Sequence, residues 1–264
     1  MKNQQFFFPE IIHIAVMVLQ TRRIVVLVLI LSIAFTGCSQ QSDENVEDVV
    51  PKNRVISFSG YDWLVRSSGV DKEGPGPNIF SDSEENVWVD GQGRLHLKIV
   101  YKEGIGYCAA VAMHKSFGYN KYVLYSSSRF DLLDANAVAG FFVYNSDVEE
   151  IDIEFSKWSV VENENAQFAI QPSSIPTNKH RFDLKMENEK ATHFFDWKPQ
   201  HITFGSFEGH VSDLSSKGYT WVYEGDDIPI DTEERLKINL WLFKGKPPVE
   251  NKDVEIIIDR VEIL

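Results

Sequence analysis

Three carboxylates occupy alternate positions in the segment Glu150-Ile-Asp-Ile-Glu-Phe155. If the segment is a strand, residues i, i+2 and i+4 share one face, so Glu150, Asp152 and Glu154 point the same way. The intervening Ile, Ile and Phe then form the opposite, core-facing side, which fixes the register of the strand. Neighbouring carboxylates disfavour one another's ionisation, so such a strand can hold one acid protonated near neutral pH while another stays anionic.

That pairing suits retaining glycoside hydrolysis, which needs a carboxylate nucleophile and a protonated acid with carboxyl groups about 5–5.5 Å apart. Residues 150 and 154 lie about 13 Å apart along a flat strand. A concave sheet and inward-leaning side chains must therefore close the gap, and we expect Asp152 to hydrogen-bond one of its neighbours. In a chain with 39 Asp and Glu among 264 residues, this spacing also arises by chance. On spacing alone, a solvated acidic strand face is the alternative.

The elements around this strand are also predicted to be β-structure. Segments 86–90 and 94–100 alternate apolar and polar residues around Asp90-Gly-Gln-Gly93, which predicts a hairpin. Similar alternation recurs at 107–113, 121–130, 137–144, 150–156, 166–171, 191–197, 201–205, 219–224, 236–243 and 254–263. No amphipathic helix of ten or more residues is expected after residue 40. Many short strands in one domain predict an all-β, two-sheet sandwich or barrel.

The N-terminal segment is typical of an export signal. Two Arg residues precede the apolar run 24–35, which is shorter than the about 20 residues of a membrane span, and Thr-Gly-Cys38 follows it. The small residues before Cys38 resemble a bacterial lipobox, so we expect 1–38 to be a signal peptide and Cys38 to carry lipid. Met17 is an alternative start of this signal. An uncleaved anchor helix is the alternative to cleavage.

The rest of the chain divides into a tether and a folded domain. Residues 39–53 are polar and acidic, which predicts a flexible tether, and 54–264 form the expected domain. With Cys38 lipidated, Cys108 has no disulfide partner and is expected to be a small buried apolar residue. These features predict an extracytoplasmic lipoprotein on the outer membrane or cell surface of a diderm bacterium.

The charge balance excludes some partners. The formal net charge is −13, and no run of Lys and Arg appears, so nucleic acid is not expected as a partner. Contact with a membrane is expected only through the lipid at Cys38. Aromatic residues make up 12% of the chain, which suits a sugar-binding surface. We expect a monomer that binds a polysaccharide and uses no cofactor.

Several segments together resemble one known family. Glu150-Ile-Asp-Ile-Glu-Phe155 resembles the signature of glycoside hydrolase family 16, the laminarinase and lichenase group. Other segments resemble that family in order and spacing: Tyr107-Cys-Ala, Phe117-Gly-Tyr119, Ala166-Gln-Phe168, His193-Phe-Phe-Asp-Trp-Lys-Pro199 and Lys237-Ile-Asn-Leu-Trp241. The resemblance spans about residues 55–264.

The resemblance implies a concanavalin A-like jelly roll of two curved antiparallel sheets, with sugar bound in the concave face. It implies Glu150 as the nucleophile, Asp152 as the assisting acid and Glu154 as the general acid/base. The expected substrate-binding residues are Asn78, Trp158, Gln167, Gln171, Asn239 and Trp241. A plain turn is the alternative for Asn78, core packing is the alternative for Trp241, and His193 and Trp197 are expected to be structural. Some relatives hold a structural calcium ion, but the sequence shows no ligand loop for one.

The chain also departs from the lichenase pattern. Ala110 and Ala112 stand where lichenases carry an acid and an Arg, and Val148 stands where they carry a Trp. Ala169 and Gln171 replace an Asn and a Tyr, so specificity for mixed-linkage glucan is not expected. The expected function is a retaining endo-glycosidase or transglycosylase acting on a β-linked polysaccharide. The alternative is a lectin-like glycan-binding lipoprotein on the same fold, and a structural lipoprotein without a glycan site is the third possibility.

Overall fold

The computed structural model describes residues 54–214 and 217–264, in which there are strands and short 3-10 turns but no α-helix. The expected signal peptide, the lipidated Cys38 and the tether fall in 1–53, outside the described residues. No described helix is long and apolar enough to span a bilayer. The strands are β1 (Val55–Phe58), β2 (Tyr61–Val65), β3 (Ile79–Phe80), β4 (Val87–Val89), β5 (Leu95–Lys102), β6 (Ile105–Met113), β7 (Lys121–Ser127), β8 (Ala137–Ser146), β9 (Glu149–Phe155), β10 (Ala166–Ile170), β11 (Lys179–Phe182), β12 (Lys190–Trp197), β13 (Ile202–Glu208), β14 (Tyr219–Tyr223), β15 (Arg235–Leu242) and β16 (Val254–Ile263). Three 3-10 turns join them: η1 (Phe130–Leu132), η2 (Pro176–Asn178) and η3 (Phe243–Gly245).

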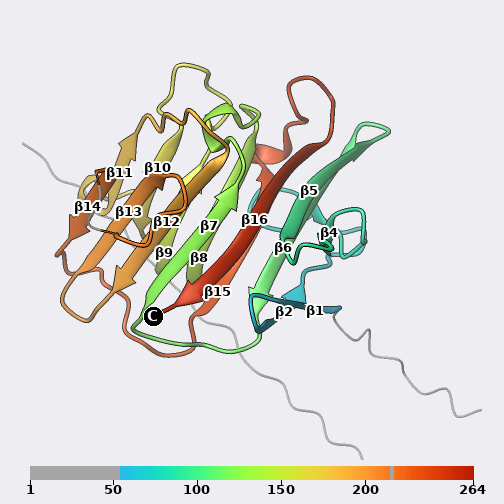
Figure 1. Ribbon diagram of the computed structural model, residues 1–264. Helices are drawn as coiled ribbons and strands as arrows, with labels where there is room; N and C mark the ends of the chain where they lie inside the picture. The colour runs from blue at the N-terminus through green and yellow to red at the C-terminus, as the bar shows by residue number, and fades with distance from the viewer. Residues whose placement is uncertain (1–53, 215–216) are drawn as a thin grey trace, which may run out of the picture. The chain divides into compact units, whose positions relative to one another are not determined.

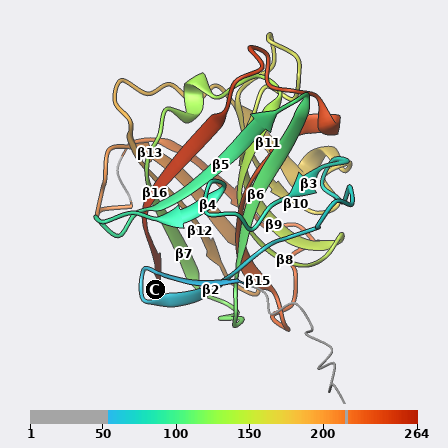
Figure 2. The same cartoon turned by 90° about the vertical axis from the view of Figure 1, so that its right-hand side faces the viewer.

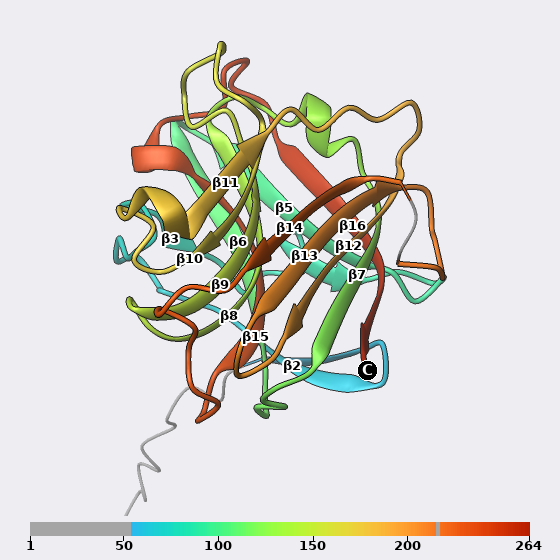
Figure 3. The same cartoon turned by 90° about the vertical axis from the view of Figure 1, so that its left-hand side faces the viewer.

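The strands form two antiparallel layers that share one hairpin. The first layer runs β11-β10-β9-β8-β15-β6, with β2 and then β1 beyond β6. The second layer runs β14-β13-β12-β7-β16-β5, and Figure 1 shows several of its strands side by side. Figure 3 shows the two layers apart from each other. The β5–β6 hairpin links their edges (Figure 2). This arrangement confirms the predicted all-β sandwich of two antiparallel sheets.

The period-2 pattern of β9 produces its two faces as predicted. Ile151, Ile153 and Phe155 are buried between the layers, at most 1% exposed. Phe155 stacks on Phe130 at a ring-centroid distance of 4.3 Å. Burying each of these side chains contributes about 1.5–3 kcal/mol, so a slip of one residue that turned them outward is strongly disfavoured. The register that holds the three carboxylates on the open face is therefore set by the core.

The core also contains two residues that were expected to be structural. Trp197 is fully buried, and its Nε1 donates to the carbonyl of Pro229 at 3.1 Å. His193 lies 4.7 Å from Phe155, on the core side of β9, and its Nδ1 is 2.8 Å from the hydroxyl of Ser206. Burial lowers the pKa of His193 to about 3, so the ring stays neutral. Both side chains pack the interior and do not reach the open face.

Cys108 is free and fully buried, as predicted for a small apolar residue. Burial raises the pKa of its thiol to about 12, which leaves it protonated and unreactive. Four strands were not expected: β1, β2, β3 and β11. They are short, and in β11 the sequence Lys-His-Arg-Phe has no apolar alternation that would reveal it. The strand expected at 121–130 ends at Ser127, because η1 turns the chain at residue 130.

Candidate active site

Strand β9, which carries the three carboxylates, lies within the first layer. Side chains on its open face line up with those of the neighbouring strands in rows across the sheet. Successive cross-strand partners form two rows over β9, β8, β15 and β6. The first row is Asp152, Phe142, Lys237 and Ala112, and the second row is Glu154, Gly140, Asn239 and Ala110. Directly opposite residues in a sheet have Cβ atoms about 4.5–5.5 Å apart, so each row forms a continuous strip of side chains.

These rows form the floor of a cavity of about 710 Å³. All three carboxylates line it, together with Gln171, Asn239 and Trp241 of the sequence-predicted set. The cavity is also lined by Leu64, Val65, Arg66, Ser67, Gly74, Pro75, Ala110, Val111, Ala112, Gly140, Phe142, Tyr144, Asp147 and Lys237. A concave site of this size with a few convergent polar groups is typical of a ligand-binding cleft.

The carboxyl groups of Asp152 and Glu150 are hydrogen-bonded to each other. The other oxygen of Asp152, Oδ2, accepts from Nε2 of Gln171 at 3.1 Å. Gln171 is held in turn because its Oε1 accepts from the backbone N–H of Ser173 at 2.8 Å. Asp152 is 4% exposed, so its charged form is poorly solvated. A proton on Asp152, donated toward Glu150, leaves Glu150 as the better anion.

Burial raises the pKa of all three carboxyl groups. The pKa of Glu150 is about 7, because desolvation outweighs the hydrogen bond from Asp152. Desolvation also raises the pKa of Asp152 well above its ordinary value, and the charges of Glu150 and Glu154 add to the effect. The pKa of Glu154 is raised by the same burial, which the hydrogen bond from Gln167 opposes. All three groups therefore release their protons at a higher pH than isolated carboxyls do.

Glu154 is held by a chain of side chains reaching away from the cavity. Gln167 Nε2 donates to Oε2 of Glu154 at 2.5 Å, and Gln167 Oε1 accepts from Nε of Arg181 at 2.9 Å. The guanidinium of Arg181 lies 4.0 Å from the ring centroid of Trp158. Because Arg181 donates to the oxygen of the Gln167 amide, it fixes which end of that amide faces Glu154. We interpret Gln167, Arg181 and Trp158 as positioning residues for this carboxyl group.

Replacing Arg181 by Gln is expected to lower the kcat of a hydrolysis at this site by about 10-fold, because Gln167 loses the donor that orients it. The KM should stay nearly unchanged. The alkaline limb of the pH–rate profile should also move to higher pH, because the hydrogen bond from Gln167 and the charge of Arg181 both lower the pKa of Glu154. A merely structural role would lower stability without moving that limb. Arg181→Lys, which keeps the charge but not the planar fork, is expected to fall between the two. Steady-state kinetics from pH 4 to 10 measure both effects.

Asn239 contributes an unpartnered oxygen to the cavity. It is 6% exposed, and its Oδ1 has no hydrogen-bond partner among the described residues. A Cβ at Gly140, its cross-strand neighbour, would lie 2.5 Å from that oxygen, so only glycine leaves the amide in place. A buried acceptor without a partner is unfavourable. A hydroxyl or N–H group of a ligand could donate to it.

Three predicted substrate-binding residues do not line the cavity. Asn78 is 3% exposed, and its Nδ2 donates to the carbonyls of Pro75 at 2.7 Å and Leu242 at 2.9 Å. The structure therefore places Asn78 as a brace for the loop that carries Gly74 and Pro75 to the cavity rim. Trp158 is buried against Arg181, as described above. Gln167 also lies outside the lining and contacts Glu154 from the neighbouring strand, as its cross-strand partner.

Sequence reasoning missed five polar residues that do line the cavity: Arg66, Ser67, Tyr144, Asp147 and Lys237. Lys237 has the same strand parity as Asn239 and Trp241, so the signal for it was present in the segment Lys-Ile-Asn-Leu-Trp. Arg66 directly follows β2, which was not expected as a strand. Tyr144 is the cross-strand partner of Glu150, a pairing that needs the β8–β9 register.

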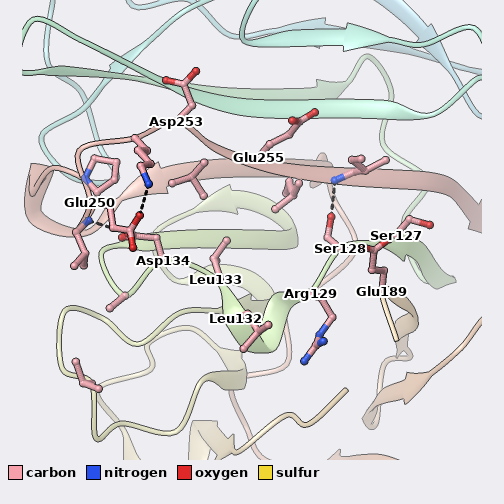
Figure 4. Close-up of a pocket in the computed structure, with 18 residues that line it drawn as sticks. Ser127, Ser128, Arg129, Leu132, Leu133, Asp134, Glu189, Glu250, Asp253 and Glu255 are labelled. Atoms are coloured by element: carbon pink, nitrogen blue, oxygen red, sulfur yellow. Dashed lines mark hydrogen bonds and ion pairs between the residues drawn. The ribbon is translucent and has the colours of Figure 1, made fainter. Parts of the chain in front are cut away.

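A second cavity of about 700 Å³ contains none of the predicted site residues (Figure 4). It lies between the loop around η1 and strand β16, and its polar groups serve the fold. The backbone N–H of Ile257 donates to the hydroxyl of Ser128 at 2.7 Å, and that of Val249 donates to Asp134 at 2.8 Å (Figure 4). Lys252 is paired with Glu250. Within 54–214 and 217–264, no cluster of three or more His, Cys, Asp or Glu side chains is arranged to hold a metal ion.

Solved structures with a fold similar to that of this chain include several glucanases. A β-glucanase of Bacillus licheniformis is 18% identical, with a TM-score of 0.59 over 76% of this chain and 91% of that one. A prokaryotic β-1,3-1,4-glucanase (lichenase) from a mouse hindgut metagenome is 21% identical, with a TM-score of 0.58 over 80% and 98%. An immunostimulatory antigen and pseudo β-1,3-glucanase of Mycobacterium tuberculosis is 15% identical, with a TM-score of 0.57 over 76% and 90%. No protein-family model and no curated protein matches the chain. At these identities the likeness establishes the fold.

Proposed function

We propose that this protein is a retaining glycoside hydrolase, or a transglycosylase of the same mechanism, that acts within a β-linked polysaccharide. The observation that carries the proposal is the set of three carboxyl groups with raised pKa values on the floor of one cavity. Such an arrangement is unfavourable for the stability of the fold, because desolvated neighbouring acids disfavour one another's charge. Perturbed groups of this kind cluster at sites that do acid–base chemistry.

In the first step, the Glu150 carboxylate attacks the anomeric carbon of the sugar while Glu154 gives its proton to the glycosidic oxygen. The carbon–oxygen bond to the leaving sugar breaks, and an ester between Glu150 and the remaining sugar forms. Asp152 stays protonated and donates to Glu150, which orients the attacking oxygen. Gln167 keeps the Glu154 carboxyl directed at the glycosidic oxygen.

In the second step, Glu154, now a carboxylate, takes a proton from a water molecule. That water attacks the anomeric carbon, the ester to Glu150 breaks, and both glutamates return to their starting states. A sugar hydroxyl in place of water gives transglycosylation by the same path. Because two inversions take place, the product keeps the configuration of the substrate.

The test is hydrolysis by the full chain of a panel of polysaccharides: β-1,3-glucan, β-1,3-1,4-glucan, sulfated galactans and polyuronates. We expect one of them to be shortened to oligosaccharides, with proton NMR showing the β-anomer as the first product. A first product of inverted configuration would overturn the mechanism. Binding of one glycan without cleavage of any would instead favour the lectin-like alternative, which the departures at residues 110, 112, 148, 169 and 171 support.

The rate is expected to follow a bell-shaped pH profile. Activity should rise as Glu150 ionises, so the acid limb is expected near the pKa of about 7. Asp152 and Lys237 lower that pKa, whereas Glu154 and Asp147 raise it. Activity should fall again when Glu154 loses the proton it must donate. Initial rates of hydrolysis between pH 4 and 10 measure this, and an acid limb near the ordinary glutamate value would contradict it.

We also propose that the protein is tethered outside the cytoplasm by lipid on Cys38. The support is the sequence alone: a short apolar run, small residues before the cysteine and an acidic tether after it. In a diderm bacterial host, the full chain is expected in the membrane fraction and labelled by radioactive palmitate. Cys38→Ser should lose the label, and Cys108→Ser should keep it. A label that survives Cys38→Ser would rule the tether out.

A further inference from the structure

The cavity carries one positive charge that forms no direct ion pair with a described residue, although the charge of Glu150 acts on it. Its lining contains two basic side chains, Arg66 and Lys237. Arg66 is already engaged: it is ion-paired with Glu73 at 2.7 Å, donates to the carbonyl of Gly74 and lies 3.9 Å from the ring centroid of Phe80. Lys237 has no hydrogen bond or ion pair within the described part of the chain.

Lys237 is nevertheless held in place. Its Nζ lies 3.7 Å from the ring centroid of Tyr144, whose hydroxyl donates to Asp147 at 3.0 Å. The ammonium is half-buried, and burial lowers its pKa to about 8. A solvated lysine on a sheet surface would extend into water, where its charge is most stable. A partly desolvated ammonium held on an aromatic face is instead positioned to bind an anion, because it has lost part of its hydration.

The neighbours of Lys237 leave space beside it. Ala112 is its direct partner on β6, and Ala110 occupies the same position in the next row, beside Asn239. Both alanines line the cavity, and neither carries a polar atom that would pair with a substrate or with Lys237. On the same strand face, the unpartnered Oδ1 of Asn239 offers an acceptor for a hydroxyl. Cation, acceptor and open space thus lie together within the cavity.

We propose that the part of the cavity bounded by Lys237, Ala112 and Ala110 is a subsite for an anionic group on the glycan, either a sulfate ester or a carboxylate. Lys237 binds the anion, and Asn239 accepts a hydroxyl from the same or the next sugar ring. The inference rests on the proposed function, because it names the class of polysaccharide for that site.

The test measures binding to full-length Glu150→Gln protein, in which turnover is expected to stop. The probes are a sulfated galactan with its desulfated form, a polyuronate with its carboxyl-reduced form, and a neutral β-glucan. One anionic glycan is expected to bind at least about 10-fold more tightly than its neutralised form, a ratio typical of one charge-assisted contact. Whichever pair shows the preference distinguishes sulfate from carboxylate.

Lys237→Gln in the same background should bring that ratio close to one, and Lys237→Arg should keep most of it. Lys190→Gln is the matched control, because Lys190 is an exposed lysine on β12 in the other layer. Thermal melting confirms that each variant is folded. A preference that survives Lys237→Gln, or that Lys190→Gln removes equally, would overturn the inference.

Two further outcomes separate this inference from the function it rests on. Cleavage or binding of a neutral β-glucan alone would refute the anionic subsite and leave the hydrolase or the glycan-binding site standing. Neither cleavage nor binding of any glycan in the panel would refute both proposals.

Discussion

Glu150→Gln is expected to reduce hydrolysis of the protein's polysaccharide by at least about 10³-fold, because the amide cannot form the ester with the sugar. The substitution keeps the size of the side chain and removes a group whose carboxyl is desolvated. Rates are compared by reducing-end release at the pH optimum. Glu149→Gln is the matched control: Glu149 is on the same strand, but it accepts from Ser146 and Asn145 outside the cavity. Its variant should keep most of the activity.

Glu150→Gln is also expected to be more stable than the natural protein above neutral pH. A carboxyl whose pKa is raised from 4.5 to about 7 on folding stabilises the fold only while it is protonated. That contribution is complete below pH 4.5 and is lost as the pH rises through 7. Glu150→Gln should therefore melt at a higher temperature at pH 8, and the difference should shrink toward pH 4. An inactive variant that is less stable at pH 8 would show that Glu150 serves the fold.

Glu154→Gln is expected to cost about 10²–10⁴-fold in kcat/KM on polysaccharide, the usual contribution of a general acid. The loss in kcat/KM, which reports the first step, should be much smaller on an aryl glycoside of the same sugar with a leaving group such as dinitrophenolate, which departs without a proton. The kcat on that substrate should still fall, because Glu154 also takes the proton from water in the second step. The ratio of the two losses in kcat/KM is therefore the diagnostic measurement. Glu164→Gln, which alters an exposed acid beyond the same strand, should leave both rates unchanged.

If Glu154→Gln lost kcat/KM equally on both substrates, Glu154 would not be the acid. Adding azide to Glu154→Ala offers a second measurement, since a small anion that needs no base can replace the water of the second step. A β-glycosyl azide product is expected from the ester intermediate. Its absence, with turnover of the aryl glycoside intact, would argue against the two-step path.

The side of β9 that bears the carboxylates was predictable because a single physical pattern determines it. Alternate apolar residues at 151, 153 and 155 need a core, and the acids have no other face to occupy. The same parity placed Asn239 and Trp241 in the cavity. Parity does not extend past the end of a strand. Trp158 follows β9 in a turn where its own φ is +47°, so its direction could not be inferred from the strand.

Contacts between distant segments were also beyond the sequence pattern. Arg181 contacts Gln167 because β10 pairs with β11. The sequence Lys-His-Arg-Phe of β11 has no pattern that predicts a strand. The side-chain amide of Asn78 donates to the carbonyl of Leu242, which is 164 positions away in the sequence. Such hydrogen bonds depend on how loops return to the sheet, and local composition carries little information about that. The carboxylates themselves were therefore easier to predict than the neighbouring residues that hold them in position.

The row pattern of the first layer has a consequence for how this protein can evolve. The acids stand on β9, whereas Ala110 and Ala112 stand on β6, three strand spacings or about 14 Å away. Substitutions that far apart usually have additive effects. Single substitutions on β6 can therefore change the substrate preference without affecting the carboxyl groups on β9. Exchanging the two alanines for larger polar residues is a direct route to libraries of altered selectivity.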